Sequence, residues 1–420
     1  MLINTKTINI AAVVDLLRPG MTVYVPGVSG ESLAFYEALK AAPERAEGVR
    51  FIGVHFPGIN TTDYLNLHPT TRQRAYFMQA HFRGSKRAQR VDLLPIDYRG
   101  VWYDLANEVE IDIALAHVSE AGPDGMSLGL SYDFLPAVWH RAKTRVALVN
   151  PQLPRTFGSF RVQERDCDFV CNAPCAPLTF DSGEPSDDLM ALARNVAHIV
   201  KDGDALQLGI GKAPAAILHE LHGHRKLRIY SGMVSDAVLP LLDAGVFDSD
   251  VPIQSGVALG GAEFYKRLDR NDRFFFRSVS ETHDIRHISS IPNFIAINSA
   301  LEIDLLGQVN CYSLDGKLFA GVGGMPAFVT GARSGEDGRS IFSLSATVQQ
   351  GQVSRIVPML SAGSFVGSPR HAADMVATEY GVAQLRGLSL EQRAVELIRI
   401  AAPQFRDQLS EQWMAIRDRF

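Results

Sequence analysis

The chain has 420 residues, of which 46% are hydrophobic and 21% charged, and its formal net charge at pH 7 is -5. A chain of this length and apolar content can bury a large core and favours two or more domains over one. The small net charge gives no reason to expect nucleic acid or an anionic membrane as a partner, and no stretch approaches the roughly 18 consecutive apolar residues of a membrane span. Residues 1–20 also lack the apolar core of a targeting segment, so we predict a soluble, cytoplasmic protein.

The first half of the chain alternates short apolar runs with amphipathic stretches, as βαβ units do. Apolar runs without polar alternation are typical of a parallel sheet that is covered on both faces. We predict strands at residues 21–26, 51–56, 111–118 and 146–149, and a helix at residues 33–42.

A polar stretch at residues 178–188, with Gly and Pro among acidic residues, predicts a linker between two domains, 1–185 and 186–420. The second half repeats the first in outline. A helix is expected at residues 189–201 and a helical C-terminus beyond Ser389, with strands near residues 205–208, 228–230, 294–298 and 340–344. The pattern predicts an α/β protein with two doubly wound domains.

Four cysteines are too few for a disulfide framework in a chain of this length, which fits a reducing compartment. Cys167, Cys171 and Cys175 are spaced four apart, whereas zinc and cluster sites usually contain tighter C-x-x-C pairs. We therefore predict buried thiols and no metal site.

His283 and His287 are also four apart, but their segment lacks the acid of an H-E-x-x-H motif, so we interpret both as ordinary polar residues near a turn. One local basic segment has two open interpretations, a solvated face or a contact with a phosphate-bearing ligand. It contains Arg83, Lys86, Arg87 and Arg90.

Two glycine clusters are candidates for ligand binding. Gly209 and Gly211 follow a strand and precede a helix, where backbone amides can hold an anion, but the nucleotide fingerprint is incomplete. A structural turn and a phosphate site both stay open there. Gly321, Gly323 and Gly324 keep side chains out of a loop whose N–H groups can point at one acceptor. Acyl transfer from a thioester needs such donors because charge develops on the carbonyl oxygen, although a tight turn is the alternative.

Longer motifs occur in order along the chain. The first half contains IDIALAHVSEAGPDGMSLG and VNPQLPRTFG, and the second contains QLGIGKAP, YSGMVSDAVLPLLDAG, IAINSALEIDLLGQVN, AGVGGMPAFVTGA, SRIVPML and ATEYGVAQLRG. Together these motifs, spread over residues 20–409, resemble the acetyl-CoA hydrolase/transferase family, which includes 4-hydroxybutyrate CoA-transferases.

The resemblance implies two α/β domains of the CoA-transferase type that face each other across a cleft, with coenzyme A bound mainly by the second. It also implies an acyl-CoA substrate, a carboxylic acid acceptor, no metal and a homodimer. It assigns coenzyme A contacts to the first glycine turn, Gly209 and Gly211, and to the G-x-G-G loop, Gly321, Gly323 and Gly324, with Phe328 close behind. Asn298 is also assigned to coenzyme A, although in the alternative interpretation it only caps a strand end.

The most informative departure from the family pattern is at Gly232. In the transferases that the chain resembles, the tip after a strand reads S-E-M-x-S-D, and the glutamate attacks the acyl thioester. This chain reads S-G-M-V-S-D at residues 231–236, at the junction of an expected strand and a helix that already contains Asp236, so Gly232 takes the place of the nucleophile. Glycine cannot form a covalent intermediate. Two further polar positions of the family pattern are occupied by Gly100 and Phe157.

A ping-pong transfer would require another acid in the same space. Glu263, Glu281 and Asp236 are candidates by sequence proximity only, and each fits a surface or capping role better. Ser231 is adjacent, but its frame is no G-x-S-x-G elbow and no histidine partner can be named.

We therefore predict an enzyme that acts on a CoA thioester, by hydrolysis or transfer, without the usual glutamyl nucleophile. The alternative is a non-catalytic CoA-ester-binding or regulatory protein. The side chains within hydrogen-bond reach of Gly232 would show which residue takes over the role of the missing carboxylate.

Overall fold

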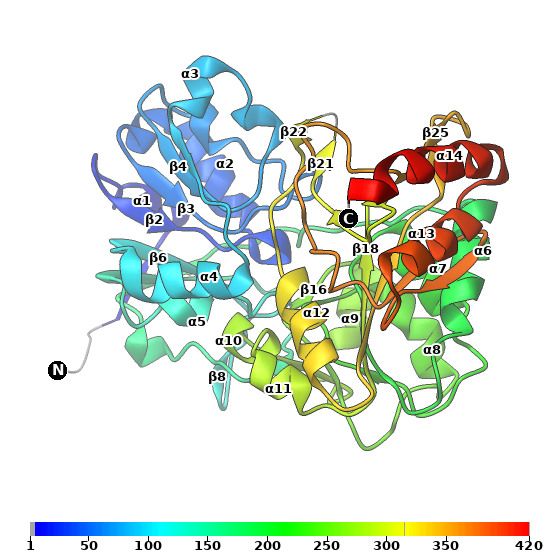
Figure 1. Cartoon of the computed structure of the whole chain (residues 1–420). Coiled ribbons are helices and arrows are strands. Elements are labelled where there is room, and N and C mark those ends of the chain that lie inside the picture. Colours follow the sequence, from blue (N-terminus) through cyan, green and yellow to red (C-terminus); the bar gives the residue numbers. More distant parts are fainter. Residues whose placement is uncertain (1–4, 315, 420) are drawn as a thin grey trace. The chain divides into compact units, whose positions relative to one another are not determined.

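The computed structural model describes residues 5–314 and 316–419 of the chain (Figure 1). The chain divides into two compact units. Unit 1 comprises Met1–Phe180, Pro252–Thr282 and Ala320–Gly323, and unit 2 comprises Asp181–Val251, His283–Phe319 and Gly324–Phe420. The division at 185/186 stays a sequence-based prediction, because the composition marks only the first change of unit and not the later returns.

Unit 1 is built on a parallel sheet with the strand order β1-β11-β9-β6-β2-β3-β4-β5. Its central strand β6 is buried along its whole length, which explains why its sequence, IALAHV, is apolar except for His117. The bounds are β1 (Lys6–Ile8), β2 (Thr22–Tyr24), β3 (Arg50–Ile52), β4 (Arg72–Ala75), β5 (Val91–Leu93), β6 (Ile113–Val118), β9 (Thr144–Val149) and β11 (Phe169–Asn172).

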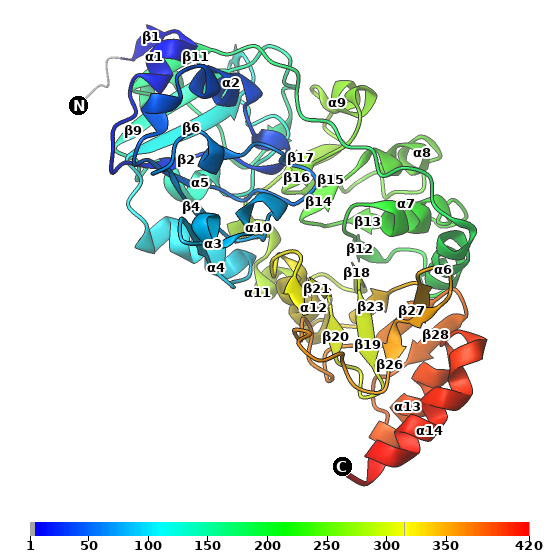
Figure 2. The ribbon, with the colours of Figure 1, turned by 90° about the horizontal axis from the view of Figure 1, so that it is seen from above.

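The helices of unit 1 are short. Helices α1 and α2 pack against each other and contribute to the core beside the sheet, and Figure 2 shows them together in blue. A smaller parallel sheet has the order β10-β17-β15, and β7 pairs with β8. The bounds are α1 (Ile10–Val14), α2 (Leu33–Ala41), α3 (Ser85–Ala88), α4 (Tyr98–Tyr103), α5 (Leu135–Val138), α9 (Ala262–Leu268), α10 (Val279–Thr282), β7 (Ala121–Gly122), β8 (Gly125–Met126), β10 (Phe157–Gly158), β15 (Ile253–Ser255), β16 (Val257–Ala258) and β17 (Phe274–Phe276).

Unit 2 contains a sheet with the order β13-β12-β18-β23-β27-β28, parallel except for its last pair. Smaller sheets have the order β20-β19-β26 and the pairs β21-β22 and β24-β25. The bounds are β12 (Ala205–Gln207), β13 (Arg228–Ile229), β14 (Met233–Val234), β18 (Phe294–Ser299), β19 (Glu302–Asp304), β20 (Val309–Asn310), β21 (Ser313–Leu314), β22 (Lys317–Leu318), β23 (Arg339–Ser343), β24 (Thr347–Val348), β25 (Val353–Ser354), β26 (Ile356–Val357), β27 (Met375–Thr378) and β28 (Gly381–Gln384).

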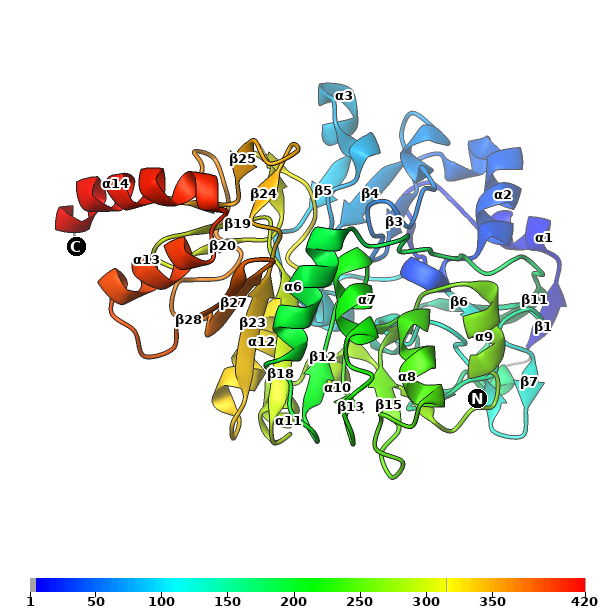
Figure 3. The same cartoon turned by 90° about the vertical axis from the view of Figure 1, so that its right-hand side faces the viewer.

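Helices cover this sheet. Helices α6 and α7 pack side by side, as Figure 3 shows in green, and α6 also contacts β27 and β28. Helix α12 packs against β18 and β23, and α13 packs against α14 and β28. The bounds are α6 (Asp187–Ala197), α7 (Lys212–His219), α8 (Leu239–Asp243), α11 (Ile285–Ser289), α12 (Met325–Ser334), α13 (Leu390–Arg399) and α14 (Arg406–Ile416).

The α/β fold with parallel sheets is confirmed, and the main predicted strands are present with shifted ends. One local prediction is wrong. The tip at Gly232 does not lead directly into a helix but into β14, followed by a 3₁₀ turn at Asp236–Val238 and then α8. In the part of the chain that the structure describes, no helix has the length and apolar character needed to cross a membrane.

Candidate active site

Gly232 lies just beyond the edge strand β13 of the unit 2 sheet. Its φ is outside the left-handed region, so the backbone conformation by itself does not require glycine. A methyl group built on Gly232 would lie 3.2 Å from Cε1 and 3.3 Å from Nε2 of His283, and 3.5 Å from Cε2 of Phe328. A side chain at position 232 would therefore be in tight contact with the imidazole ring, which would have to shift by a few tenths of an ångström.

His283 is buried, with 1% of its surface exposed. Its ring centroid is 4.6 Å from that of Phe328, with the planes tilted by 55°. A methyl group on Gly324 would lie only 2.2 Å from Nε2 and 2.8 Å from Cδ2 of His283. Gly324 also has an ordinary φ, -89°, at the start of α12, so its missing side chain serves to admit the imidazole.

His283 does lie at a turn, as expected, but it is not an ordinary polar residue, because its side chain is buried. The spacing between His283 and His287 does not reveal the burial, because the partners Gly232, Gly324 and Phe328 are far away in the sequence. His287 is exposed and its ring packs 5.0 Å from Tyr230.

The other candidates near the tip have different partners. The buried hydroxyl of Ser231 donates a hydrogen bond to the carbonyl oxygen of Leu208, at 2.7 Å. Asp236 begins the 3₁₀ turn and lines a surface hollow of about 490 Å³ beside α7. The atoms nearest to a methyl group on Gly232 belong to His283 and Phe328 and not to a carboxylate.

The two glutamates lie in unit 1. Glu263 is exposed and its carboxylate is 3.4 Å from Nζ of Lys266. Glu281 accepts hydrogen bonds from Ser159 and Arg277. Burial alone would raise the pKa of Glu281, but these hydrogen bonds outweigh it and lower the pKa. Both contacts fit the surface role that the sequence favours.

The first glycine turn differs from the tip at Gly232. Gly211 has φ +108°, which side chains rarely adopt, and a methyl group there would meet nothing within 4 Å. A methyl group on Gly209 would approach only Cγ of Pro214, at 3.9 Å. Helix α7 begins directly after this open turn, so its first amide groups and the turn stay a candidate anion site.

The structure brings several of the expected residues to one edge of the unit 2 sheet. β12, β13 and β18 are parallel neighbours, and Gly209, Gly232 and Asn298 lie at or just past their carboxyl ends. Ligands bind at this edge in open α/β sheets. The side-chain amide of Asn298 donates to Oε1 of Gln207 at 3.2 Å, which is the strand-end contact of the alternative interpretation.

The glycine loop is divided between the units. In unit 1, a methyl group on Gly321 would lie 2.2 Å from the carbonyl oxygen of Tyr76, and Gly323 has φ +66°. The carbonyl oxygen of Gly323 accepts a hydrogen bond from the backbone N–H of Tyr98, at 3.0 Å. Close approach and backbone conformation therefore explain these two glycines, whereas Gly324 in unit 2 admits His283.

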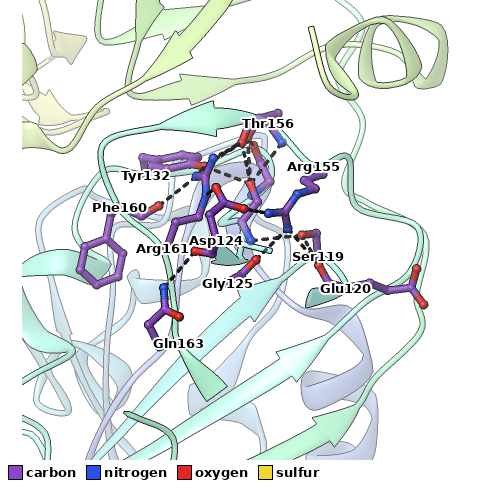
Figure 4. A network of polar contacts seen from close by, with 12 residues as sticks. Ser119, Glu120, Asp124, Gly125, Tyr132, Arg155, Thr156, Phe160, Arg161 and Gln163 are labelled. Atoms are coloured by element: carbon purple, nitrogen blue, oxygen red, sulfur yellow. Dashed lines mark hydrogen bonds and ion pairs between the residues drawn. The ribbon is translucent and has the colours of Figure 1, made fainter. Parts of the chain in front are cut away.

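The two motifs of the first half are bound to each other in unit 1 (Figure 4). Arg155 forms an ion pair with Asp124 and donates to the carbonyl oxygen of Gly125 at 2.7 Å, and Arg161 donates to Asp124 at 2.9 Å. Thr156 donates to the carbonyl oxygen of Gly129 at 2.6 Å. These contacts give the motifs a structural role.

The two other positions that we predict to depart from the family pattern are in unit 1. Phe157 belongs to β10 and is 41% exposed. The amide of Gly100, within α4, donates to the carboxylate of Asp97 at 2.8 Å.

The basic segment is only partly a solvated face. Nη1 of Arg87 lies 2.7 Å from the carboxylate of Asp63, and Arg90 donates to three backbone carbonyl groups of the 65–71 segment. These two arginines hold neighbouring loops together.

The prediction of buried thiols is confirmed for two of the spaced cysteines. Burial raises the pKa of Cys167 to about 12 and that of Cys171 to about 11. Cys175 is partly exposed, with its sulfur 3.8 Å from Nε2 of His117, so the prediction is wrong for this residue.

Comparisons with known proteins extend these observations over the whole chain. Residues 260–413 match the family model described as acetyl-CoA hydrolase/transferase C-terminal domain. The chain is 34% identical to 4-hydroxybutyrate coenzyme A transferase of Clostridium kluyveri, over 81% of this chain and 82% of that protein. It is 31% identical to succinyl-CoA:cyclohexane-1-carboxylate CoA transferase of Geobacter metallireducens, over 94% and 92%. The crystal structure of RipA from Yersinia pestis has a TM-score of 0.89 and 25% identity, with 98% of each chain covered.

Proposed function

Because the chain belongs to the acetyl-CoA hydrolase/transferase family, we propose that it cleaves the thioester bond of an acyl-CoA without a glutamyl nucleophile. Relatives named for CoA transfer to or from carboxylic acids support acyl-CoA as the substrate class and a carboxylic acid as a product or acceptor. Direct attack by water on the thioester carbonyl is the reaction that we favour.

The observation that carries this proposal is the absence of a side chain at Gly232 together with the His283 ring beside it. Glycine has no atom that can bond to an acyl group, and the imidazole of His283 fills the neighbouring volume. Exchange of acyl and CoA groups in two half-reactions needs a covalent carrier on the protein. Without that carrier, the acyl carbon must be attacked directly by the final acceptor.

Backbone amide groups of unit 2 are suited to the remaining chemistry. Helix α12 begins after Gly324, and the N–H groups of its first turn have no partner within the helix, although Pro326 contributes no N–H group. Donors of this kind stabilise the oxyanion that forms when a thioester is attacked. We assign coenzyme A contacts in unit 2 to the open turn at Gly209 and Gly211 and to Asn298. The assignment of Gly321 and Gly323 in unit 1 stays a prediction.

The experiment measures free thiol released by the full-length chain from a panel of short, branched and hydroxylated acyl-CoA esters, with and without added carboxylic acids. We expect thiol release that does not depend on the added acid. Borohydride or hydroxylamine added during turnover should leave the enzyme active, because both inactivate an enzyme that passes through a glutamyl thioester.

Two outcomes would contradict the proposal. A CoA adduct on a protein carboxylate, found by mass spectrometry during turnover, would show a covalent route through another acid. Tight binding of CoA esters without release of thiol from any member of the panel would instead identify a non-catalytic binder.

A further inference from the structure

Two glycines of unit 2, Gly232 and Gly324, lie against the imidazole ring of His283. Neither Gly232 nor Gly324 has a φ that requires glycine, yet a methyl group on either would lie within 3.3 Å of Nε2 of His283. On Gly324 that distance is 2.2 Å, so the imidazole would have to move to admit any side chain. The absence of side chains at both positions therefore makes room for His283.

The ring is also held by an aromatic contact. Phe328, which is 2% exposed, packs against His283 at 4.6 Å and against Phe294 at 6.4 Å. Such contacts restrict the orientation of the ring, and a catalytic base must be held within a narrow range of orientations. Phe328 thus acts on His283, in addition to any contact with coenzyme A.

The position of Nε2 is significant for the chemistry. It lies 3.3 Å from the point where Cβ of a residue at 232 would be. A glutamate has two further carbon atoms beyond Cβ, so its carboxylate would reach this same region. An imidazole nitrogen therefore lies within the reach that a glutamate carboxylate at position 232 would have.

We propose that His283 is the general base that replaces the missing carboxylate, so that the enzyme is an acyl-CoA hydrolase. This inference rests on the proposed function and adds the residue and the attacking group. Neutral imidazole accepts a proton near neutral pH, which makes histidine the usual residue for this task.

The reaction balances without a further reactant. The oxygen of a water molecule forms a bond to the thioester carbonyl carbon while the water proton passes to His283. The tetrahedral oxyanion then collapses, the C–S bond breaks, and the imidazolium returns the proton to the departing CoA thiolate. The products are a carboxylic acid and free coenzyme A.

The test compares His283→Gln with the control His287→Gln, which changes an exposed histidine four residues further along the chain. We expect kcat for thiol release to fall about 100-fold or more in His283→Gln, since a positioned base typically contributes 10²- to 10⁴-fold. KM, CoA binding and the melting temperature should change little, and the control should retain full activity. Wild-type turnover that persists in His283→Gln would overturn this inference alone, whereas a wild-type chain that releases no thiol would overturn the proposed function as well.

A second variant separates a base from a space-filling ring. In His283→Gly, added imidazole should restore part of the thiol release, while pyrrole, which has the same shape but no basic nitrogen, should not. Equal restoration by both compounds would show that the ring only fills space and would overturn the proposal.

Discussion

The two glycine tips of the unit 2 sheet follow neighbouring strands, yet they need glycine for opposite reasons. At Gly211 the φ of +108° demands glycine, and the space beyond the Cα atom is open. At Gly232 the conformation is available to any residue, and the space is occupied by His283. The first glycine therefore serves the backbone and the second serves a neighbouring side chain. Substitution separates these two roles.

The largest effect is expected from Gly324→Ala. Its methyl group would lie 2.2 Å from Nε2 of His283, so the imidazole must move. Displacing a catalytic group by about 1 Å can cost about 100-fold in rate, and we expect a loss of that size in kcat for thiol release. The matched control is Gly223→Ala in the same unit, where a methyl group meets nothing within 4 Å and φ is not left-handed. Equal kcat for both variants would show that thiol release does not depend on the position of the His283 ring.

A second substitution restores the carboxylate of the family pattern. Gly232→Glu alone should not regain glutamyl chemistry, because Cβ at position 232 would already lie 3.2 Å from the His283 ring, which crowds the longer side chain. The double variant Gly232→Glu with His283→Gly should form a CoA adduct on Glu and become sensitive to borohydride. Carboxylate-dependent CoA transfer should be about tenfold or more higher in the double variant, as expected when a misplaced group is allowed to align. A CoA adduct of equal yield in Gly232→Glu alone would show that His283 does not crowd a side chain at position 232.

Part of this difference between the two tips can be predicted from the sequence. The parallel strands and the open turn at Gly209 and Gly211 follow from local signals, namely apolar runs and a glycine turn before a helix. Gly232 stands out in the sequence because the family pattern that the chain resembles predicts an acid at this position. His283 could not be found in this way, since its burial depends on contacts with residues that fold together only in the tertiary structure.

The sequence also predicts only part of the division into two units. The linker before α6 is marked by polar composition, and Ser186 caps the helix by accepting a hydrogen bond from the amide of Leu189. The return of residues 252–282 and 320–323 to unit 1 has no such composition signal. Contacts between distant parts of the chain decide it.

Stability should distinguish the two tips. Gly211→Ala forces a side chain into a left-handed conformation, which should cost about 1–3 kcal/mol in the free energy of unfolding. Gly232→Ala places a methyl group 3.2 Å from His283 without backbone strain, so we expect a loss of less than about 1 kcal/mol. Urea denaturation of both variants measures the difference. A larger loss at Gly232 would mean that the ring cannot shift, and would reverse the proposed order.

The smallest effect is expected from Ser231→Ala, next to the occupied tip. The hydroxyl group of Ser231 donates to the carbonyl oxygen of Leu208 at 2.7 Å, which ties the end of β13 to that of β12. Its removal should reduce the free energy of unfolding by about 1 kcal/mol, the usual net value of one hydrogen bond. Turnover should nevertheless persist, because a hydroxyl committed to a buried carbonyl is not available for attack on a thioester. Loss of thiol release in a folded Ser231→Ala variant would instead identify Ser231 as the nucleophile and His283 as its base, and the reaction would then pass through an acyl-serine and not through direct attack by water.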